Sequence, residues 1–335
     1  IYGLKKDDFV VTEDNKPQEI QTFTLGDDKE IPRSIVLIID YSGSQLPFIE
    51  RNVEATKLLV DKLRPNDLMA LVTDDVELIS QFTSDKALLK EKLELLKQNA
   101  LARKVGKSMQ FSALYAVLSE MFDDEDVRPI VLFQTDGDQF NNLKGGFNEI
   151  LGLPPFAPNM TTNFNFNDLL SSIEKSRATI YTIVPGFRLL GLSPQERSAK
   201  LRADREMRMK MSQPLPSATP PVQRSPEQMA ELQKYFEKRR ELMQIYYPKG
   251  LPDIQEMLFG MSKYSGGWID FLEKPEDADG VYSRILSEIN TRYVIGYNPT
   301  NEAKDGKRRV VKISVKNHKD YTVWGRKTYI APLLD

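Results

Sequence analysis

The regular alternation of apolar runs with amphipathic segments limits this chain to few folds. Apolar runs of strand length recur along it, in SIVLIID, DLMALVTD, RPIVLFQTD, ATIYTIVP and GGWIDFL. Between them lie segments such as SDKALLKEKLELLKQ, in which apolar residues recur every three or four positions. Buried strands that alternate with helices are typical of a parallel sheet covered on both faces. We therefore predict an α/β fold with a doubly wound, mostly parallel sheet.

Composition excludes several classes of function. The 335 residues are 40% hydrophobic, which suffices for one large domain with additions or for two domains. The net charge of −2 gives no basic excess for nucleic acid or an anionic membrane. The absence of cysteine excludes disulfides, thiolate metal sites and cysteine nucleophiles. No run approaches the length of a membrane span, and we expect any leader segment to lie outside this sequence.

Both ends of the chain read as β structure outside the α/β region. DDFVVTEDNKPQEIQTFTL holds β-like runs around the turn-forming EDNKP, and the tail contains RYVIGYNP, RRVVKISVKN and YTVWGRKTYI. An isolated hairpin, or the three tail strands by themselves, would not easily bury their apolar side chains. We therefore predict that residues 1–31 and 292–335 form one small β extension of a domain spanning residues 32–291, with Phe23 or Leu25 in a shared core.

Two long segments interrupt the α/β pattern. The first, residues 140–167, is rich in Asn, Gly and Pro and is too long for an ordinary connection. The second, about residues 186–249, contains two helical patterns separated by SQPLPSATPPVQRSP, so we predict a helical insertion. Because both follow strands expected to be parallel, they should emerge at the carboxyl edge of the sheet, where open α/β folds bind ligands. A helical insertion that only covers apolar surface or forms a dimer is the alternative.

The segment IDYSGS is expected to place polar side chains at that same edge. Asp40 ends an apolar strand, and the hydroxyls of Ser42 and Ser44 follow two and four residues later. A carboxylate with neutral hydroxyls is a hard-oxygen set that suits Mg²⁺ or Mn²⁺. One loop rarely supplies all the ligands of an octahedrally coordinated metal ion. Ser112 and Asp136 offer oxygen ligands from two further loops. We expect these five residues to meet at one metal site.

The motifs resemble those of the von Willebrand factor type A family. DYSGS matches its Asp-x-Ser-x-Ser motif, TDGD its Thr-Asp-Gly segment, and FSALYAVL its threonine loop, with Ser112 in place of the usual threonine. LKKDDFVVTEDNKPQEIQTF and GGWIDFLEKPEDADGVYSRILSEINTRYVIGYNP are similar to the bacterial, acidobacterial-type VWFA-related proteins. The resemblance covers most of the chain and implies a Rossmann-like sheet, whereas the insertion at about residues 186–249 has no counterpart.

The resemblance also implies a function. Ser42, Ser44 and Ser112 would ligate a metal ion directly or through water, as in a metal-ion-dependent adhesion site (MIDAS). Asp40 and Asp136 would complete the shell, largely through waters. The ion would be Mg²⁺, with Mn²⁺ or Ca²⁺ as substitutes, and an acidic residue of a partner protein would occupy its open position. The resemblance favours a secreted, periplasmic or cell-surface adhesion protein that binds and does not catalyse.

Each of these residues also has an alternative interpretation. Asp40, Asp136 and Ser112 could simply cap the helices that follow them. Ser44, Asp136 and His318 occur in the chain order of α/β-hydrolases, although neither Ser44 nor Ser42 has the flanking glycines of a nucleophile elbow. A structural module with a vestigial metal site is a third alternative. Asp74 and Asp75 are expected to form a turn.

Overall fold

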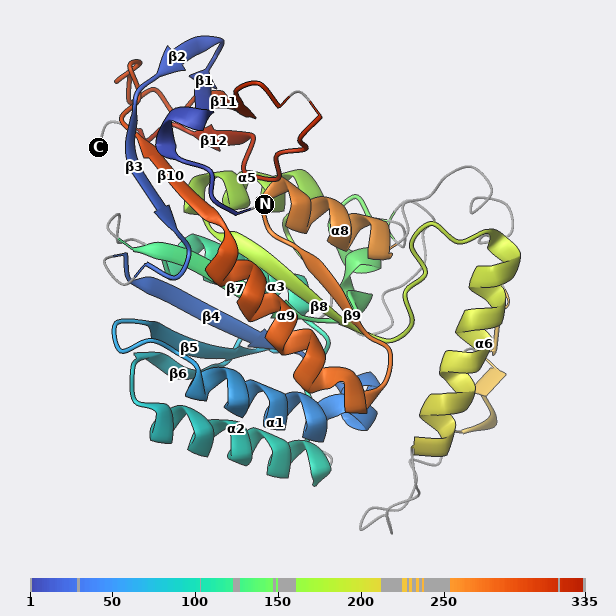
Figure 1. Cartoon of the computed structure of the whole chain (residues 1–335). Helices are drawn as coiled ribbons and strands as arrows, with labels where there is room; N and C mark the ends of the chain where they lie inside the picture. The colour runs from blue at the N-terminus through green and yellow to red at the C-terminus, as the bar shows by residue number, and fades with distance from the viewer. Residues whose placement is uncertain are drawn as a thin grey trace.

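A six-stranded sheet forms the centre of the molecule (Figure 1). The computed structural model describes residues 2–146 apart from 29–30, 103 and 123–126, then residue 149, residues 161–211, scattered positions between 225 and 237, and residues 254–318 and 320–333. Within these, the strand order is β6-β5-β4-β7-β8-β9, and only β6 runs antiparallel to its neighbour. The strands are β4 (Arg33–Ile39), β5 (Leu68–Thr73), β6 (Leu78–Thr83), β7 (Arg128–Gln134), β8 (Thr179–Pro185) and β9 (Ile269–Leu272). The predicted fold class is confirmed.

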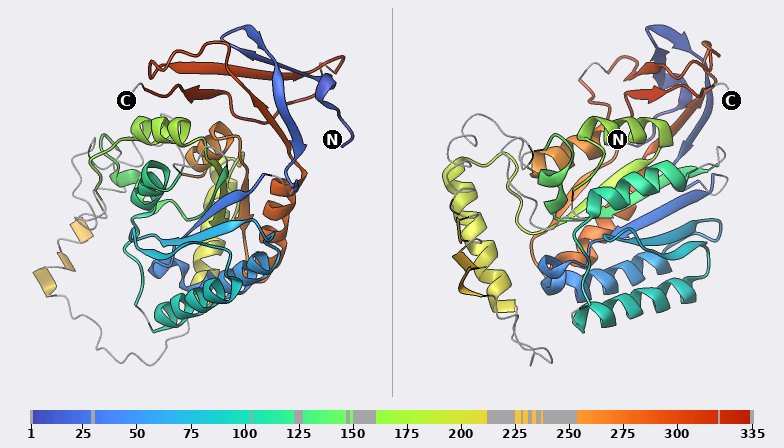
Figure 2. Two further views of the ribbon diagram at one scale, coloured as in Figure 1. Left: turned by 90° about the vertical axis from the view of Figure 1, so that its left-hand side faces the viewer. Right: turned by 180° about the vertical axis from the view of Figure 1, so that it is seen from behind.

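Helices cover both faces of the sheet, as the two views in Figure 2 show. Successive residues of a strand point to opposite faces, so Leu37 enters one core and Ile38 the other. The first core is closed by α1 (Leu46–Asp61), α2 (Lys86–Leu101) and α9 (Ala278–Thr291), and the second by α3 (Gln110–Glu120), α5 (Phe166–Ser176) and α8 (Ile254–Tyr264). None of the helices in the described part of the chain combines the length and apolar character needed to cross a bilayer.

The two ends of the chain pair with each other in an accessory β layer. β1 (Phe9–Glu13) lies between β11 (Arg308–Val315) and β2 (Lys16–Gln18), β12 (Thr328–Ile330) extends β11, and β3 (Ile20–Leu25) pairs with β10 (Tyr293–Tyr297). Phe9 and Val11 form a third core, against which Phe23, Val311 and Ile313 pack. The predicted extension from both termini is therefore present. The exact domain boundaries stay a prediction.

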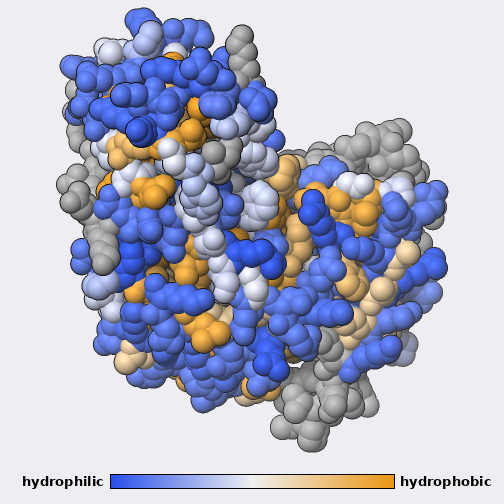
Figure 3. Space-filling model, viewed as in Figure 1, coloured by the Kyte–Doolittle hydropathy of each residue, from blue (hydrophilic) through white to orange (hydrophobic). Residues whose placement is uncertain are grey.

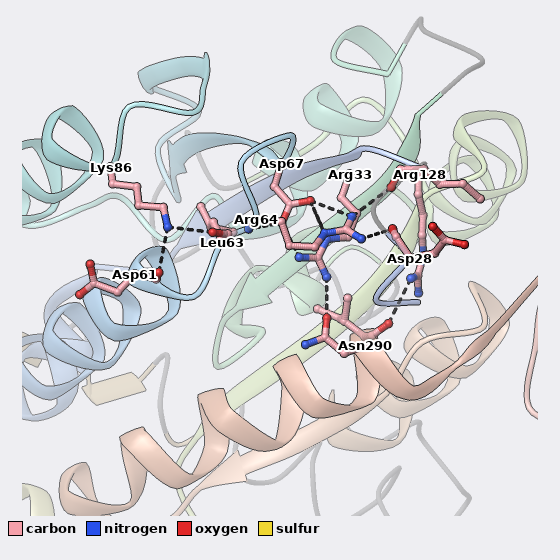
Figure 4. A network of polar contacts seen from close by, with 11 residues as sticks. Asp28, Arg33, Asp61, Leu63, Arg64, Asp67, Lys86, Arg128 and Asn290 are labelled. Carbon is pink, nitrogen blue, oxygen red and sulfur yellow. Dashed lines mark hydrogen bonds and ion pairs between the residues drawn. The ribbon is translucent and has the colours of Figure 1, made fainter. Parts of the chain in front are cut away.

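A buried ionic network closes the amino edge of the main sheet. Arg33, at the start of β4, donates to Asp67, which directly precedes β5, and to Asn290 of α9 at 2.7 Å. Arg64 donates to the same carboxylate from its backbone N at 2.8 Å and from its guanidinium at 2.9 and 3.0 Å. Figure 4 shows both arginines converging on Asp67. The carboxyl edge, at the opposite ends of the strands, is built differently.

The insertion begins with a helix at the carboxyl side of the sheet. α6 (Pro194–Met211) follows β8 and stands beside the main domain, opposite the accessory layer in the view of Figure 1. The second helical pattern, in SPEQMAELQKYFEKRRELMQIYY, lies largely outside the described residues. In the view of Figure 3 hydrophilic side chains cover most of the surface, and hydrophobic residues form small patches between them. α6 contributes the exposed side chains of Leu201 and Met209.

Candidate metal centre

Three neighbouring strands are each followed by an aspartate at the carboxyl edge. β5, β4 and β7 run parallel and in register; Asp74 and Asp40 directly follow the first two, and Asp136 lies two residues beyond the end of the third. The Asp40 N–H donates to the Gln134 carbonyl at 3.2 Å, and the Asp74 N–H donates to the Ile39 carbonyl at 3.1 Å. The backbone therefore fixes the spacing of the three loops before any side chain is considered.

The DYSGS loop folds back on its own aspartate. Asp40 is fully buried, and its Oδ1 accepts the Ser42 N–H at 3.1 Å and the Ser42 hydroxyl at 2.6 Å. The 3-10 turn Gly43–Gln45 then leads into α1 and brings the Ser42 and Ser44 hydroxyl oxygens to 3.1 Å. One short loop thus presents a carboxylate and two hydroxyls close together, with Ser42 at the N-cap of the turn and Ser44 within it.

Asp136 completes this cluster from the next loop. Its Oδ2 accepts the Ser44 hydroxyl at 2.6 Å and the Gln45 amide at 2.7 Å. The Gln110 amide donates to Asp40 Oδ2 at 2.9 Å and also lies 3.4 Å from Asp136 Oδ1. Burial decreases outward, since Asp40 is fully buried, Asp136 is half-buried and Ser44 is exposed. Four of the five residues expected at the site therefore form one hydrogen-bonded cluster that opens to solvent at Ser44.

Ser112 occupies a different place from the other four. It lies in the first turn of α3, where its N–H donates to Gln139 Oε1 at 3.0 Å and its hydroxyl accepts from Gln139 Nε2 at 2.7 Å. The N-cap of α3 is Met109, so the reading of Ser112 as a helix cap is wrong. Gln110, two residues earlier, is the α3 residue that reaches the two carboxylates. Ligation by Ser112 stays a prediction.

Asp74 and Asp75 form the predicted turn after β5, and Asp74 is in addition a buried carboxylate at this edge, which was not predicted. It is fully buried, and its side chain accepts the Tyr41 N–H at 3.1 Å and the Ser108 N–H at 2.8 Å. A methyl group at Gly106 would come within 2.0 Å of Asp74 Oδ1, so only glycine leaves room for this contact. Asp74 therefore ties the DYSGS loop to the loop before α3. Its signal in the sequence was the one that marked Asp40 and Asp136, an aspartate that ends an apolar strand.

The environment of the carboxyl edge disfavours the ionised form of its buried aspartates. Burial, followed by the charges of Asp136 and Asp74, raises the pKa of Asp40 well above its usual range, and hydrogen bonds from Ser42 and Gln110 offset only part of this. Burial raises the pKa of Asp74 to about 7. The side chains that bond to Asp40 and Asp136 are neutral hydroxyls and amides. Buried carboxylates with neutral partners are stabilised by a cation or a proton.

The structure does not bring Ser44, Asp136 and His318 together as a hydrolase triad. Ser44 does donate to Asp136. His318, however, follows β11 in the accessory layer, where its ring stacks on Tyr321 at 4.3 Å. Among the described residues its imidazole makes no hydrogen bond to Ser44 or Asp136, so the base of a triad is missing from this place.

The order of the strands and the motif loops indicates the type of fold. DYSGS follows the central strand β4 and TDGD follows its parallel neighbour β7, so both motifs meet at one sheet edge, as the von Willebrand resemblance implies. The chain has a von Willebrand factor type A-like fold. No protein-family model matches it, and no curated protein matches its sequence.

Several solved structures are similar to this chain. BatB from Bacteroides thetaiotaomicron is 16% identical, with a TM-score of 0.43 over 77% of this chain and 98% of that chain. The vWF domain of the type V pili tip protein Mfa5 from Porphyromonas gingivalis is 13% identical, with a TM-score of 0.35 over 57% and 100% of the two chains. A von Willebrand factor type A protein from Catenulispora acidiphila is 15% identical, with a TM-score of 0.36 over 61% and 50%. At these identities the similarity concerns the fold alone.

Acidic groups alone do not define a metal site in this chain. Among the described residues, no group of three or more His, Cys, Asp and Glu side chains is placed to hold an ion. The oxygen donors that do converge are two carboxylates and two serine hydroxyls. In addition, Gln45 Oε1 and Gln134 Oε1 are buried at the same edge without a hydrogen-bond partner in the described part of the chain. This donor set fits a small, hard cation.

Proposed function

We propose that this chain is a metal-ion-dependent protein-binding module. Asp40, Ser42, Ser44, Ser112 and Asp136 would hold Mg²⁺, with Mn²⁺ or Ca²⁺ as substitutes. The observation that carries the proposal is the convergence of the Asp40, Ser42, Ser44 and Asp136 oxygens, through hydrogen bonds of 2.6 to 3.1 Å, at an edge that opens to solvent.

The graded burial of the site supports binding of an external ligand. Asp40 lies at the bottom, where its carboxylate would offset much of the charge of the ion, and Ser44 lies at the exposed rim. Bound there, the ion would supply a Lewis-acid position that accepts an oxygen from outside the chain. The neutral serine hydroxyls would leave much of its charge available. A carboxylate of a partner protein is the ligand that this chemistry favours.

We propose binding and adhesion in place of catalysis. The cluster offers ligand oxygens, and its serines lack the strained turn and the histidine that a nucleophile needs. By the resemblance to bacterial VWFA-related proteins we further propose a location outside the cytoplasm, at the cell surface or in the periplasm. Immunodetection of the native protein in separated cell fractions tests this location, and a purely cytoplasmic signal contradicts it.

Calorimetric titration with Mg²⁺ tests the metal site. The variants are Asp40→Asn and Asp136→Asn, which remove charge with little change of shape, and the control is Asp279→Asn on the exposed side of α9. The wild type and the control should bind one ion, and both site variants should lose most of the affinity. Equal binding by all four proteins, or binding by none, contradicts the proposal, and binding by none favours a structural module with a vestigial site.

An array of short peptides tests the class of partner. Each peptide would carry one Asp or Glu, and its matched control would carry Asn or Gln at that position. Mg²⁺-dependent capture of acidic peptides, lost in EDTA and in the amide controls, is the expected result. Capture that ignores both the carboxylate and the ion contradicts a partner carboxylate as the ligand.

A further inference from the structure

Helix α6 touches the main domain along one narrow stripe. Its half-buried side chains are Arg197, Lys200, Asp204, Met207 and Arg208, spaced at three, four, three and one positions, and most of the rest of the helix is exposed. Met207 packs against the core formed by α1, α2 and α9. The helix therefore docks through the stripe that ends at Met207 and Arg208, next to the start of α1 (Figures 1 and 2).

Arg208 is the contact that reaches the proposed metal site. Its Nη1 donates to the Ser44 carbonyl at 2.6 Å, and its Nη2 donates to the Pro185 carbonyl at the end of β8 at 3.1 Å. The guanidinium also lies 5.0 Å from the centre of the Phe48 ring in α1. One side chain of the insertion thus holds the DYSGS loop, the first turns of α1 and the end of β8.

Two neighbouring residues, Asp204 and Gly186, allow the Arg208 guanidinium to occupy this position. Asp204, one turn earlier on α6, accepts from Arg208 Nε at 2.7 Å. Gly186, with φ of +126°, lies directly under Nη2, and a Cβ there would come within 3.0 Å of it. A planar guanidinium can donate to several fixed acceptors and stack on a ring at once, which a lysine ammonium cannot do.

We propose that Arg208 is a positioning residue for Ser44, so that docking of α6 and cation binding at the DYSGS loop are coupled. The coupling rests on the proposed metal site, whereas the positioning rests only on the contacts of Arg208. With its carbonyl held by Arg208 and its hydroxyl bonded to Asp136, Ser44 is fixed from both sides. A loop that is already ordered loses less conformational entropy when it binds an ion. Because coupling is reciprocal, a bound ion should also hold α6 more firmly on the domain.

The charge of Arg208 and its positioning role predict opposite effects of its substitution on cation affinity. A guanidinium near the site repels a cation, so removal of its charge alone would tighten binding. If positioning dominates, both Arg208→Gln, which loses the charge, and Arg208→Lys, which keeps it, should weaken binding. Arg205→Gln removes the same charge from an exposed position of α6 and serves as the matched control.

The experiment combines Mg²⁺ calorimetry with hydrogen exchange of the whole chain. We expect both Arg208 variants to bind Mg²⁺ about fivefold to tenfold more weakly, within the usual range of coupling, and Arg205→Gln to bind like the wild type. Without any cation, amides of residues 41–48 should exchange faster in both Arg208 variants. Addition of Mg²⁺ should slow exchange in α6 of the wild type and not in Arg208→Gln.

The two readouts separate failure of this proposal from failure of the metal site. Unchanged exchange of residues 41–48 in both Arg208 variants overturns the positioning role, whether or not the protein binds metal. Unchanged or tighter Mg²⁺ binding by the variants overturns the coupling. A wild type that binds no Mg²⁺ refutes the proposed function and the coupling together, and faster loop exchange in the variants then still supports the positioning role.

Discussion

The Ser44 hydroxyl donates a 2.6 Å hydrogen bond to the carboxylate of Asp136, 92 residues further along the chain. This bond joins the loop after β4 to the loop after β7, and it is possible because the two strands are parallel neighbours in register. The same serine accepts the Arg208 guanidinium on its carbonyl oxygen. Ser44 is therefore the point at which the sheet edge, the proposed ion site and the insertion meet.

Removal of the ion should lower thermal stability. A ligand that binds only the native state adds about 2.7 kcal/mol when its concentration is a hundred times Kd. We expect Mg²⁺ at that excess to raise the melting temperature of the wild type by several degrees and EDTA to reverse the shift. Differential scanning fluorimetry measures it. The melting temperature of Asp136→Asn should not respond, and an equal response in this variant would point to ion binding elsewhere.

Serine substitutions should distinguish the two kinds of serine near the site. Ser44→Ala should weaken Mg²⁺ binding by about tenfold or more, because its hydroxyl already lies in the cluster. Ser112→Ala should weaken it less, since the Ser112 hydroxyl must first leave Gln139. Ser171→Ala, at a half-buried serine of α5 whose hydroxyl donates to the Asn167 carbonyl, is the control. If calorimetry finds Ser112→Ala as damaging as Ser44→Ala, Ser112 is a full ligand and Gln139 yields to the ion.

Gly106→Ala should destabilise the protein through Asp74. The new methyl group would approach Asp74 Oδ1 to 2.0 Å, so the carboxylate or the loop has to move. Overpacking of this kind costs about 1–3 kcal/mol. Gly260→Ala, in the middle of α8 with no atom within 4 Å of the new group, should instead stabilise by about 0.5–1 kcal/mol. Urea unfolding measures both, and equal midpoints would mean that Asp74 is not held as the structure indicates.

Loss of the Asp67 carboxylate should be costly and should change the response to acid. Burial raises the pKa of Asp67, but hydrogen bonds from Arg33 and Arg64 outweigh burial and lower the pKa below its usual value. A lowered pKa means that the folded state binds the proton less readily than the unfolded state. The contribution is thus complete above an unfolded pKa of about 3.9 and is lost as the pH falls through the lower folded pKa.

The variant Asp67→Asn tests this account. Breaking one partner of a buried pair costs about 3–5 kcal/mol, whereas Asp61→Asn breaks the exposed pair with Lys90 and should cost at most about 1 kcal/mol. Urea unfolding at pH 7 and below pH 4 measures both effects. The deficit of Asp67→Asn relative to the wild type should shrink at the lower pH, and a deficit that is constant with pH would contradict the assigned pKa shift.

The sequence predicted the sheet and the convergence of its DYSGS and TDGD loops because both depend on local patterns. An apolar run that ends in aspartate marks a buried strand and its carboxyl end, and parallel pairing then brings Asp40 and Asp136 together. The same rule applies to Asp74, whose turn with Asp75 was predicted but whose burial at the sheet edge was not. The terminal strands were predicted from their alternation and from the need to bury one face.

Other parts of the site depend on contacts that no local pattern encodes. Gln110 and Ser112 are two positions apart on α3, and the orientation of that helix alone decides which of them faces Asp40. Arg208 stands in a helix rich in basic residues, and only docking distinguishes it from its exposed neighbour Arg205. Such choices are made by packing between distant segments, so they become visible only in three dimensions.

A crystal structure of the wild type with Mn²⁺, phased to show the anomalous signal of the metal, tests the central claim most directly. We predict one strong anomalous peak at the carboxyl edge, within ligand distance of the Ser42 and Ser44 hydroxyls and bridged to Asp40 and Asp136 directly or through water. The absence of a peak there at saturating Mn²⁺, or a peak held by residues outside this cluster, would contradict it.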